Sequence, residues 1–459
     1  MGNLKPLKPP SSQPNDPNAR SGVDSRTRIA APTAETPWLP PPLAKIEDTG
    51  LTRSQLEGLV LKLMFFRTEM IGRDIAETVK LPFAGIVENV LESLRRDKCL
   101  DVMASAGYTE SQYRYVITSK GNERAQEQLE RGTYTGPCPV PLESYIASIK
   151  EQNKARRKIR EEDMLRVLEN LIVDKEMLDK IGPAANSGTS IFLYGPPGNG
   201  KTTLSEAIGR VILGDDMWIP YAVDVDGQVI QIYDPVNHQL SDDQTPIKYG
   251  TGAYADQRWI RIKRPIIIVG GELTMDGLDL TYDPINKFYE APYQVKANGG
   301  MFLIDDFGRQ QVSPKQLLNR WIVPLEKKYD YLTLANGRKI EIPFNVMIIF
   351  STNMDPRDLV DDAFLRRIKY KIEVGNPTPE QFRALFELMC RLRNVPFNEQ
   401  GFAYLIREWY QKYNRDLRFV HPRDLISQMR DIADYMGIAP TMGNKELLDR
   451  AAASYFVEL

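Results

Sequence analysis

Residues 190–203 read Ser-Ile-Phe-Leu-Tyr-Gly-Pro-Pro-Gly-Asn-Gly-Lys-Thr-Thr, and this stretch decides the fold. Residues 191–194 form an apolar, strand-like run, a glycine-rich turn follows, and apolar residues then recur at helical spacing over residues 204–212. A chain that passes from strand to glycine turn to helix directs several backbone N–H groups and the positive end of a helix dipole toward one place. The stretch therefore predicts a phosphate-binding loop.

The side chains of this loop predict a nucleotide that is held together with magnesium. In a loop of this kind the lysine reaches the β and γ phosphates and the next hydroxyl ligates Mg²⁺, and here these residues are Lys201 and Thr202. The backbone amides of residues 198–202 would surround the phosphates. The residues expected to bind the nucleotide are Gly195, Pro196, Pro197, Gly198, Asn199, Gly200, Lys201, Thr202 and Thr203.

The composition excludes several other classes of protein. The 459 residues carry 59 Lys and Arg against 61 Asp and Glu, so no overall field favours nucleic acid or an anionic membrane. The three cysteines (Cys99, Cys138 and Cys390) have no paired or metal-like spacing, which indicates a reducing, cytoplasmic location. The two histidines, His238 and His421, are too few for a histidine-based zinc site. No apolar run approaches the roughly 20 residues that span a bilayer, so we expect no membrane insertion.

Composition also divides the chain before the phosphate loop. Residues 1–46 are rich in proline and polar side chains, and they predict a disordered tail. Residues 47–136 show three helical patterns, two strand-like runs and a closing helical pattern, an order that resembles a winged-helix domain. Residues 137–159 are expected to form a linker.

The charge of the winged-helix-like segment bears on its partner. Residues 47–131 contain 12 Lys or Arg and 14 Asp or Glu, which gives a net charge of −2. A domain that reads DNA usually presents a basic footprint. We therefore favour docking to a protein, and DNA binding remains the disfavoured alternative.

Two later apolar runs end in polar residues that suit phosphoryl transfer. Residues 301–304 lead into Asp305 and Asp306, and a carboxylate at the end of such a strand can orient a metal-bound water. Residues 344–351 lead toward Asn353, which either positions the attacking water or caps the end of the strand. The sequence pattern leaves both roles of Asn353 open.

Two hairpins are expected around this core. Residues 214–264 read as an insertion, because apolar residues alternate on both sides of the Asp-Gly turn signal at 226–227. A second hairpin is expected over residues 331–342, with its turn at the Asn-Gly pair 336–337.

From about residue 160 to the end, the order of these parts resembles the AAA+ ATPases. The matching segments are Walker A at residues 195–202, Walker B at residues 301–306, sensor 1 at Asn353, an arginine-finger segment at Arg366 and Arg367, and sensor 2 at Arg423 within the His-Pro-Arg-Asp-Leu of residues 421–425. Ile181 and Gly182 stand where the family has its adenine pocket. The Gly-Gly-Met-Phe-Leu-Ile-Asp-Asp segment and the second hairpin are similar to the branch that contains MoxR-type ATPases, magnesium chelatases and bacterial enhancer-binding activators.

The resemblance implies a fold, cofactors and an assembly. The fold would be an α/β P-loop NTPase, with a five-stranded parallel sheet in the order 5-1-4-3-2 over residues 160–375 and a helical lid over residues 376–459. The cofactors would be ATP and Mg²⁺, with Thr202 and Asp305 as the metal ligands. The protein would form a homo-oligomer, a hexameric ring, in which Arg367 or Arg366 reaches the γ phosphate bound by a neighbouring subunit.

One departure from the family keeps more than one function open. Walker B of the family usually ends in Asp-Glu, whereas this chain has Asp305-Asp306, with a general base one methylene shorter. The leading hypothesis is an ATP hydrolase that remodels a protein partner, which the winged-helix-like domain and the 214–264 insertion would select. The alternatives are a nucleotide-dependent switch of the STAND type whose winged helix binds DNA, and a scaffold that binds ATP only for assembly.

Overall fold

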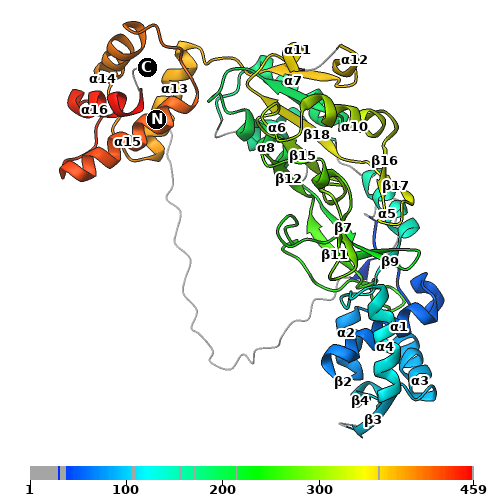
Figure 1. Cartoon of the computed structure of the whole chain (residues 1–459). Coiled ribbons are helices and arrows are strands. Elements are labelled where there is room, and N and C mark those ends of the chain that lie inside the picture. The colour runs from blue at the N-terminus through cyan, green and yellow to red at the C-terminus, as the bar shows by residue number, and fades with distance from the viewer. Residues whose placement is uncertain are drawn as a thin grey trace, which may run out of the picture.

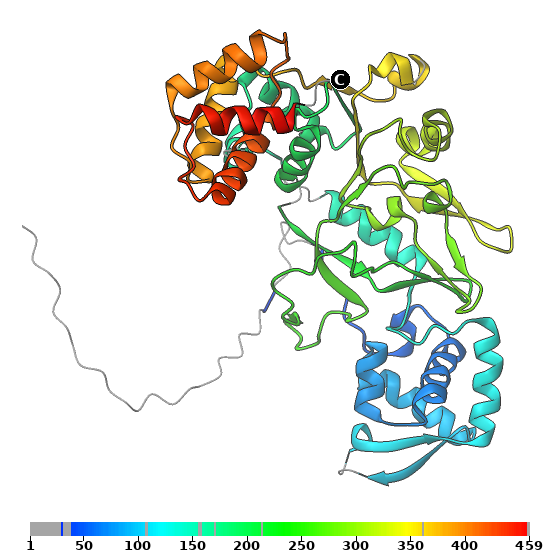
Figure 2. The same ribbon diagram turned by 60° about the vertical axis from the view of Figure 1, so that its left-hand side comes forward.

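The computed structural model describes residues 29–30, 38–105, 109–154, 158–168, 171–212, 214–359 and 362–456. An α+β domain lies at one end of the chain, a central region with two five-stranded sheets follows, and a bundle of helices forms the other end (Figures 1 and 2). Most of the expected disordered tail, residues 1–28 and 31–37, lies outside the described residues.

The central sheet contains five parallel strands in the spatial order β12-β15-β18-β6-β19. The strands are β6 (Ile191–Tyr194), β12 (Ile266–Val269), β15 (Met301–Ile304), β18 (Met347–Thr352) and β19 (Tyr370–Glu373). Numbered along the chain from β6, the order is 5-1-4-3-2, which confirms the predicted topology. The strand β12 lies at the edge of the sheet, where Ile268 is 42% exposed.

Both faces of this sheet are covered, because alternate side chains of a strand point to opposite faces. One face packs against α6 (Glu161–Val167), α7 (Lys175–Ser187) and α8 (Lys201–Ile212). The other face packs against α10 (Pro314–Lys327) through an aromatic cluster. The cluster includes Trp321 of α10 together with Phe192, Phe302, Phe307 and Phe350. The two apolar layers hold the interior strands in place, so the ends of those strands are fixed relative to one another.

A second five-stranded sheet has the order β13-β14-β9-β8-β5. Its strands are β5 (Val140–Pro141), β8 (Ala222–Val225), β9 (Gln228–Gln231), β13 (Thr281–Asp283) and β14 (Phe288–Glu290). The strands β8 and β9 form the hairpin that the Asp-Gly pair predicts.

Several other elements surround this sheet. They are α5 (Leu142–Lys154), the pair β7 (Asp216–Pro220) and β11 (Trp259–Lys263), the hairpin β16 (Tyr329–Thr333) and β17 (Lys339–Pro343), the pair β1 (Ile29–Ala30) and β10 (Lys248–Tyr249), and the short elements η4 (Asp276–Leu278) and α9 (Tyr293–Lys296). Side chains of α5, β7, β11 and both hairpins share one apolar core.

This second sheet corrects two expectations. Residues 137–159, expected as a linker, supply β5 and α5, and the α5 side chains Tyr145 and Ile149 are buried in the shared core. The sheet also takes β13 and β14 from beyond residue 264, so it does not coincide with the 214–264 insertion. Pairing between strands so far apart in the chain leaves no local signal in the sequence.

The N-terminal domain is built around a core of buried apolar residues that Ala222 of β8 also joins. Its elements are η1 (Ile46–Thr49), α1 (Arg53–Arg67), β2 (Glu69–Ile71), α2 (Gly72–Val79), η2 (Phe83–Val87), α3 (Glu88–Arg96), β3 (Leu100–Ser105), η3 (Glu110–Gln112), β4 (Tyr113–Ile117) and α4 (Ser119–Arg131). The strands pair in the order β2-β4-β3, one strand more than expected. Leu43 and Ile46 are buried in this core, so the described end of the expected tail belongs to the folded domain.

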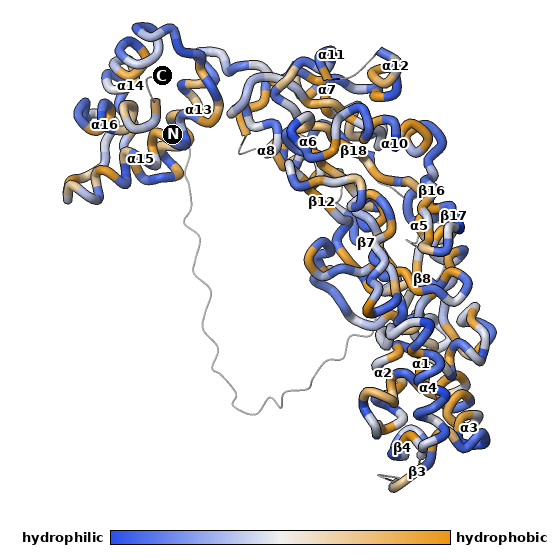
Figure 3. The backbone as a smooth tube through the Cα atoms, in the orientation of Figure 1, coloured by the Kyte–Doolittle hydropathy of each residue, from blue (hydrophilic) through white to orange (hydrophobic). Residues whose placement is uncertain are grey.

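The C-terminal region is built of helices, as expected for residues 376–459. They are α13 (Pro379–Leu392), α14 (Glu399–Leu405) with its continuation η5 (Ile406–Gln411), α15 (Val420–Met436) and α16 (Lys445–Tyr455). Hydrophilic and hydrophobic residues alternate along these helices (Figure 3), as expected where one face packs inward. Two short helices, α11 (Pro356–Leu359) and α12 (Asp362–Leu365), belong to the connection between β18 and β19 of the central sheet. Within the described ranges, no helix is long and apolar enough to cross a membrane.

A buried ion pair joins the N-terminal domain to the central region. The guanidinium of Arg258 pairs with Asp256 at 2.9 Å, and the two side chains are 4% and 1% exposed. Arg258 also donates hydrogen bonds to the carbonyl oxygens of Thr49 and Pro139. One side chain therefore connects the end of η1, the segment before β5 and the segment before β11.

We predict that Arg258→Met lowers the free energy of unfolding by about 3–5 kcal/mol, because it leaves Asp256 charged, buried and unpaired. Urea denaturation, followed by hydrogen exchange in residues 46–131, measures the loss. The control is the double variant Arg258→Met with Asp256→Leu, which removes both charges and should recover much of the stability. Equal losses in the single and double variants would contradict the ion-pair argument.

We also predict that the helical C-terminal region loses stability as the pH falls from about 6.5 to about 4. Burial lowers the pKa of His421 to about 4, and the charge of Arg418 acts in the same direction. The unfolded chain, with an ordinary histidine pKa near 6.5, therefore takes up a proton before the folded chain does, so protonation favours unfolding in this window. NMR titration of the two histidines measures this pKa, with His238→Gln to assign the signals. A His421 resonance that titrates near pH 6.5 would contradict the prediction.

Candidate functional site

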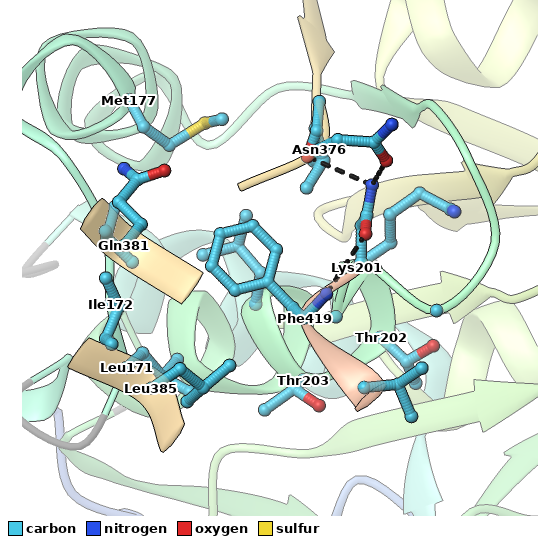
Figure 4. A pocket seen from close by; sticks show the side chains of 18 of the residues that line it. Leu171, Ile172, Met177, Lys201, Thr202, Thr203, Asn376, Gln381, Leu385 and Phe419 are labelled. Carbon is cyan, nitrogen blue, oxygen red and sulfur yellow. Dashed lines mark hydrogen bonds between the residues drawn. The ribbon is translucent and has the colours of Figure 1, made fainter. Parts of the chain in front are cut away.

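A pocket of about 880 Å³ lies where the central sheet, α7 and the C-terminal helices meet. The turn between β6 and α8 lines one part of the pocket, and residues that follow β15, β18 and β19 line another. In the close-up view, Ile172, Met177 and Gln381 lie on one side, Lys201 and Asn376 lie on the other, and the ring of Phe419 lies between them (Figure 4).

The β6–α8 turn takes a conformation that requires glycine at its start. Gly195 has a φ of 138°, and a Cβ atom there would lie 2.3 Å from the carbonyl oxygen of Val374. The turn can therefore pass close to the end of β19 only with glycine at this position. Helix α8 begins at Lys201, so the backbone N–H groups of its first turn have no intrahelical acceptor and are oriented toward the pocket end of the helix.

A chain of hydrogen bonds links the ends of three parallel strands. The Lys201 amine donates to Asn353 Oδ1 at 2.7 Å, and Asn353 Nδ2 donates to Asp306 Oδ1 at 3.0 Å. The same amine donates to the carbonyl oxygens of Gly195 and Pro196 at 2.9 Å. Burial lowers the pKa of Lys201, and the nearby charges of Asp305 and Asp306 oppose this effect.

A second contact joins the turn to the end of β15. The Thr202 hydroxyl donates to Asp305 Oδ2 at 2.7 Å. A hydroxyl and a carboxylate are hard oxygen donors, the type of ligand that Mg²⁺ prefers. Among the described residues, no group of three or more His, Cys, Asp or Glu side chains could hold a metal ion. A metal at this position would therefore need other ligands, such as phosphate oxygens and water.

The backbone of Asp306 gives a structural reason for aspartate at this position. Its φ is 48°, in the left-handed region where Asp and Asn occur several times more often than most other residues. A glutamate at this position would gain a methylene but would lose that tolerance. The departure from Asp-Glu therefore agrees with the local conformation of this chain.

The pocket brings together most of the residues predicted from the sequence. The predicted residues that line it are Pro197, Gly198, Asn199, Gly200, Lys201, Thr202, Thr203, Asp305, Asp306, Asn353 and Arg423. Gly195 and Pro196 do not line the pocket, but their carbonyl oxygens bind the Lys201 amine.

Ile181 and Gly182 do not line the pocket, contrary to expectation. Both lie in α7, where Ile181 is fully buried in the core beneath the sheet. The pocket is lined instead by the segment before α7 and by its first two turns, including Leu171, Ile172 and Met177. The helix begins at Lys175, and its residues that line the cavity all come before Ile181.

Arg366 and Arg367 lie outside the pocket of their own chain, just after α12. Arg366 is exposed. The Arg367 guanidinium donates to Glu326 of α10 at 2.6 Å, and the Arg367 side chain is 27% exposed. The arginine-finger assignment therefore stays a prediction about contacts between two copies of the chain.

The segment before α15 closes the pocket, and the sequence patterns missed it. Arg418 donates to the carbonyl oxygen of Pro197 at 3.2 Å, and Phe419 and Val420 line the cavity. The expected Arg423 also lines the cavity, with its Nε donating to Asp424 at 2.8 Å. The only sequence signal for this segment was its place directly before the His-Pro-Arg-Asp-Leu residues.

Comparisons with known proteins give a distant similarity in fold. A sequence profile described as a domain of unknown function (DUF8689) matches residues 378–454, and no curated protein matches the chain. NtrX from Brucella abortus, solved in complex with ADP, is 13% identical, with 73% of this chain and 67% of NtrX covered and a TM-score of 0.40. The Thermotoga maritima RuvB Holliday junction branch migration motor is 15% identical, with 66% of this chain and 74% of RuvB covered and a TM-score of 0.34. These likenesses are too distant to assign a function, and the structure itself shows a five-stranded parallel sheet with flanking helices and a C-terminal helical region.

Proposed function

We propose that this protein binds ATP with Mg²⁺ and hydrolyses the γ phosphate. The observation that carries the proposal is the convergence of Lys201, Thr202, Asp305, Asp306 and Asn353 at one end of the pocket. These residues follow three different parallel strands, and each has a side chain suited to a distinct part of phosphoryl transfer.

The two ends of the pocket suit the two ends of a nucleotide. At the glycine turn, the backbone amides and the Lys201 amine offer donors and positive charge for the phosphates. At the other end, Leu171, Ile172, Met177 and Leu385 offer an apolar surface for a base. ATP would therefore lie along the pocket, with its triphosphate on the turn and its adenine near α7 and α13.

Mg²⁺ would be held by Thr202 and Asp305, whose side chains already lie 2.7 Å apart. When bound, the ion would neutralise charge on the phosphates during transfer. The Asn353–Asp306 hydrogen bond of 3.0 Å supports this proposal, because it brings an amide and a carboxylate together beside the Lys201 amine. In this proposal Asp306 accepts the proton of that water and Asn353 orients it.

The assembly and biological role are part of the same proposal. The protein would work as a ring-shaped oligomer, a hexamer, that remodels a protein partner. Arg367, or Arg366, would then stabilise the γ phosphate bound by a neighbouring copy, because neither side chain lines the pocket of its own chain. The N-terminal domain would dock the partner, since the residues between 47 and 131 carry a net charge of −2 and lack the basic excess of a DNA reader.

Lys201→Ala should reduce ATP affinity by about 100-fold, because the phosphates lose a charge-assisted hydrogen bond. Isothermal titration calorimetry with Mg-ATP measures the loss, and circular dichroism confirms that the variant is folded. The matched control is Lys412→Ala, which removes the same charge from a 62% exposed side chain of the C-terminal region. Unchanged ATP affinity in Lys201→Ala would refute the proposed binding site.

Asp306→Asn should bind ATP with the wild-type affinity and hydrolyse it about 10² to 10⁴ times more slowly, because an amide cannot accept the proton of the water. Asp305→Asn should instead weaken binding that depends on Mg²⁺. Phosphate release under saturating ATP, together with calorimetry, separates the two effects.

Asp306→Glu provides a further comparison within this experiment. It should still turn over ATP, although the left-handed backbone at this position makes the longer side chain less stable there. If Asp306→Asn hydrolyses ATP at the wild-type rate, the base lies elsewhere, and Glu272 after β12 is the next carboxylate to test.

A further inference from the structure

The side chain of Asn199 connects three segments that are far apart in the sequence. Its Nδ2 donates to the carbonyl oxygen of Gly375 at 3.0 Å and to Asn376 Oδ1 at 2.8 Å. Its Oδ1 accepts a hydrogen bond from the backbone N–H of Phe419 at 3.3 Å. The phosphate-binding turn is thereby joined to the β19–α13 connection and to the start of α15, and Figure 4 draws these bonds as dashed lines at Asn376 and Phe419.

The chemistry of the partners determines how this amide is oriented. Gly375 offers a carbonyl oxygen and Phe419 offers an N–H group, so only one orientation of the Asn199 amide satisfies both. The residue is 4% exposed, and both of its N–H groups and its oxygen have partners. An alanine at this position would leave the Phe419 N–H and the Gly375 carbonyl without these bonds.

Two further hydrogen bonds join residues 418–420 to the phosphate-binding turn. The backbone N–H of Val420 donates to the carbonyl oxygen of Gly198 at 2.9 Å, and Arg418 donates to that of Pro197 at 3.2 Å. Each of the residues 418–420 therefore donates a hydrogen bond to one residue of the turn, Pro197, Asn199 and Gly198 respectively. The ring of Phe419, the middle residue, lines the pocket near Leu385 (Figure 4).

We propose that Asn199 is a positioning residue that holds Phe419 over the nucleoside part of the bound nucleotide. The inference rests on the proposed nucleotide binding and assigns to Asn199 a role in addition to the phosphate contacts of its backbone. Its side chain bonds to the β19–α13 connection and to the N–H of Phe419, and it would affect the nucleotide by positioning Phe419. The affinity for the nucleoside thus depends on Asn199, whereas the affinity for the phosphates depends on the backbone amides and Lys201.

The experiment compares Mg-ATP with inorganic triphosphate and Mg²⁺ by calorimetry. In Asn199→Ala, ATP affinity should fall about three- to tenfold, the effect expected for the loss of one or two hydrogen bonds. Triphosphate affinity should stay within about twofold of wild type, because triphosphate does not reach Phe419. Phe419→Ala keeps the backbone N–H and should show the same selective loss.

Two more variants test whether Asn199 acts through Phe419. The double variant Asn199→Ala with Phe419→Ala should bind ATP no more weakly than the weaker single variant, since both changes remove one interaction. Asn376→Ala removes one acceptor but leaves the Gly375 and Phe419 bonds, so its effect should be smaller than that of Asn199→Ala.

The outcomes separate this inference from the proposed function. Equal losses for ATP and triphosphate in Asn199→Ala would show that the residue supports the turn itself, which overturns the positioning role. Unchanged ATP affinity in Asn199→Ala, or additive losses in the double variant, would also overturn it while leaving ATP binding intact. A wild-type protein that binds neither ATP nor triphosphate would refute the proposed function and the inference with it.

Discussion

The hydrogen-bond chain from Lys201 through Asn353 to Asp306 depends on the parallel direction of β6, β15 and β18. Parallel strands place their carboxyl ends at one edge of a sheet, so residues that follow three distant segments meet there. If one of these strands ran the other way, its terminal residue would lie at the opposite edge and the chain would be broken. The apolar layers on both faces of the sheet maintain this alignment, because each interior strand is buried on both sides.

The other half of the pocket belongs to a separate core. The C-terminal helices bury their apolar faces against one another, and their contacts with the phosphate-binding turn come from residues 418–420 and from the connection at residues 375–376. These contacts are hydrogen bonds to backbone groups and to Asn199. The pocket is therefore complete only where the two cores are in contact.

The second sheet is attached to the central sheet through the β16–β17 hairpin. The apolar side chains Leu332, Ile340 and Ile342 of this hairpin are buried with residues of α5 and β7. Arg320 of α10 pairs with Asp330 at the base of the same hairpin. The hairpin thus packs against the second sheet and is joined by an ion pair to α10, which covers the central sheet.

The sequence by itself determined the glycine-rich turn after β6, the two carboxylates after β15 and the asparagine after β18. Each of these signals lies within a few consecutive residues: an apolar run followed by glycine, Asp-Asp or Thr-Asn. The resemblance to the AAA+ family supplied the strand order and the helical C-terminal region, both of which the structure contains.

Only the tertiary structure decided which residues complete the pocket and which segments form the second sheet. Ile181 faces the core because α7 is rotated so that its earlier residues line the cavity, and a helix's rotation depends on what it packs against. Asn199 acquires its three partners only when β19 and α15 are in place. The pairing of β5, which lies in the expected linker, with β8 could not be predicted from the sequence for the same physical reason. Contacts between distant segments depend on the packing of the whole chain, whereas a local sequence pattern depends only on neighbouring residues.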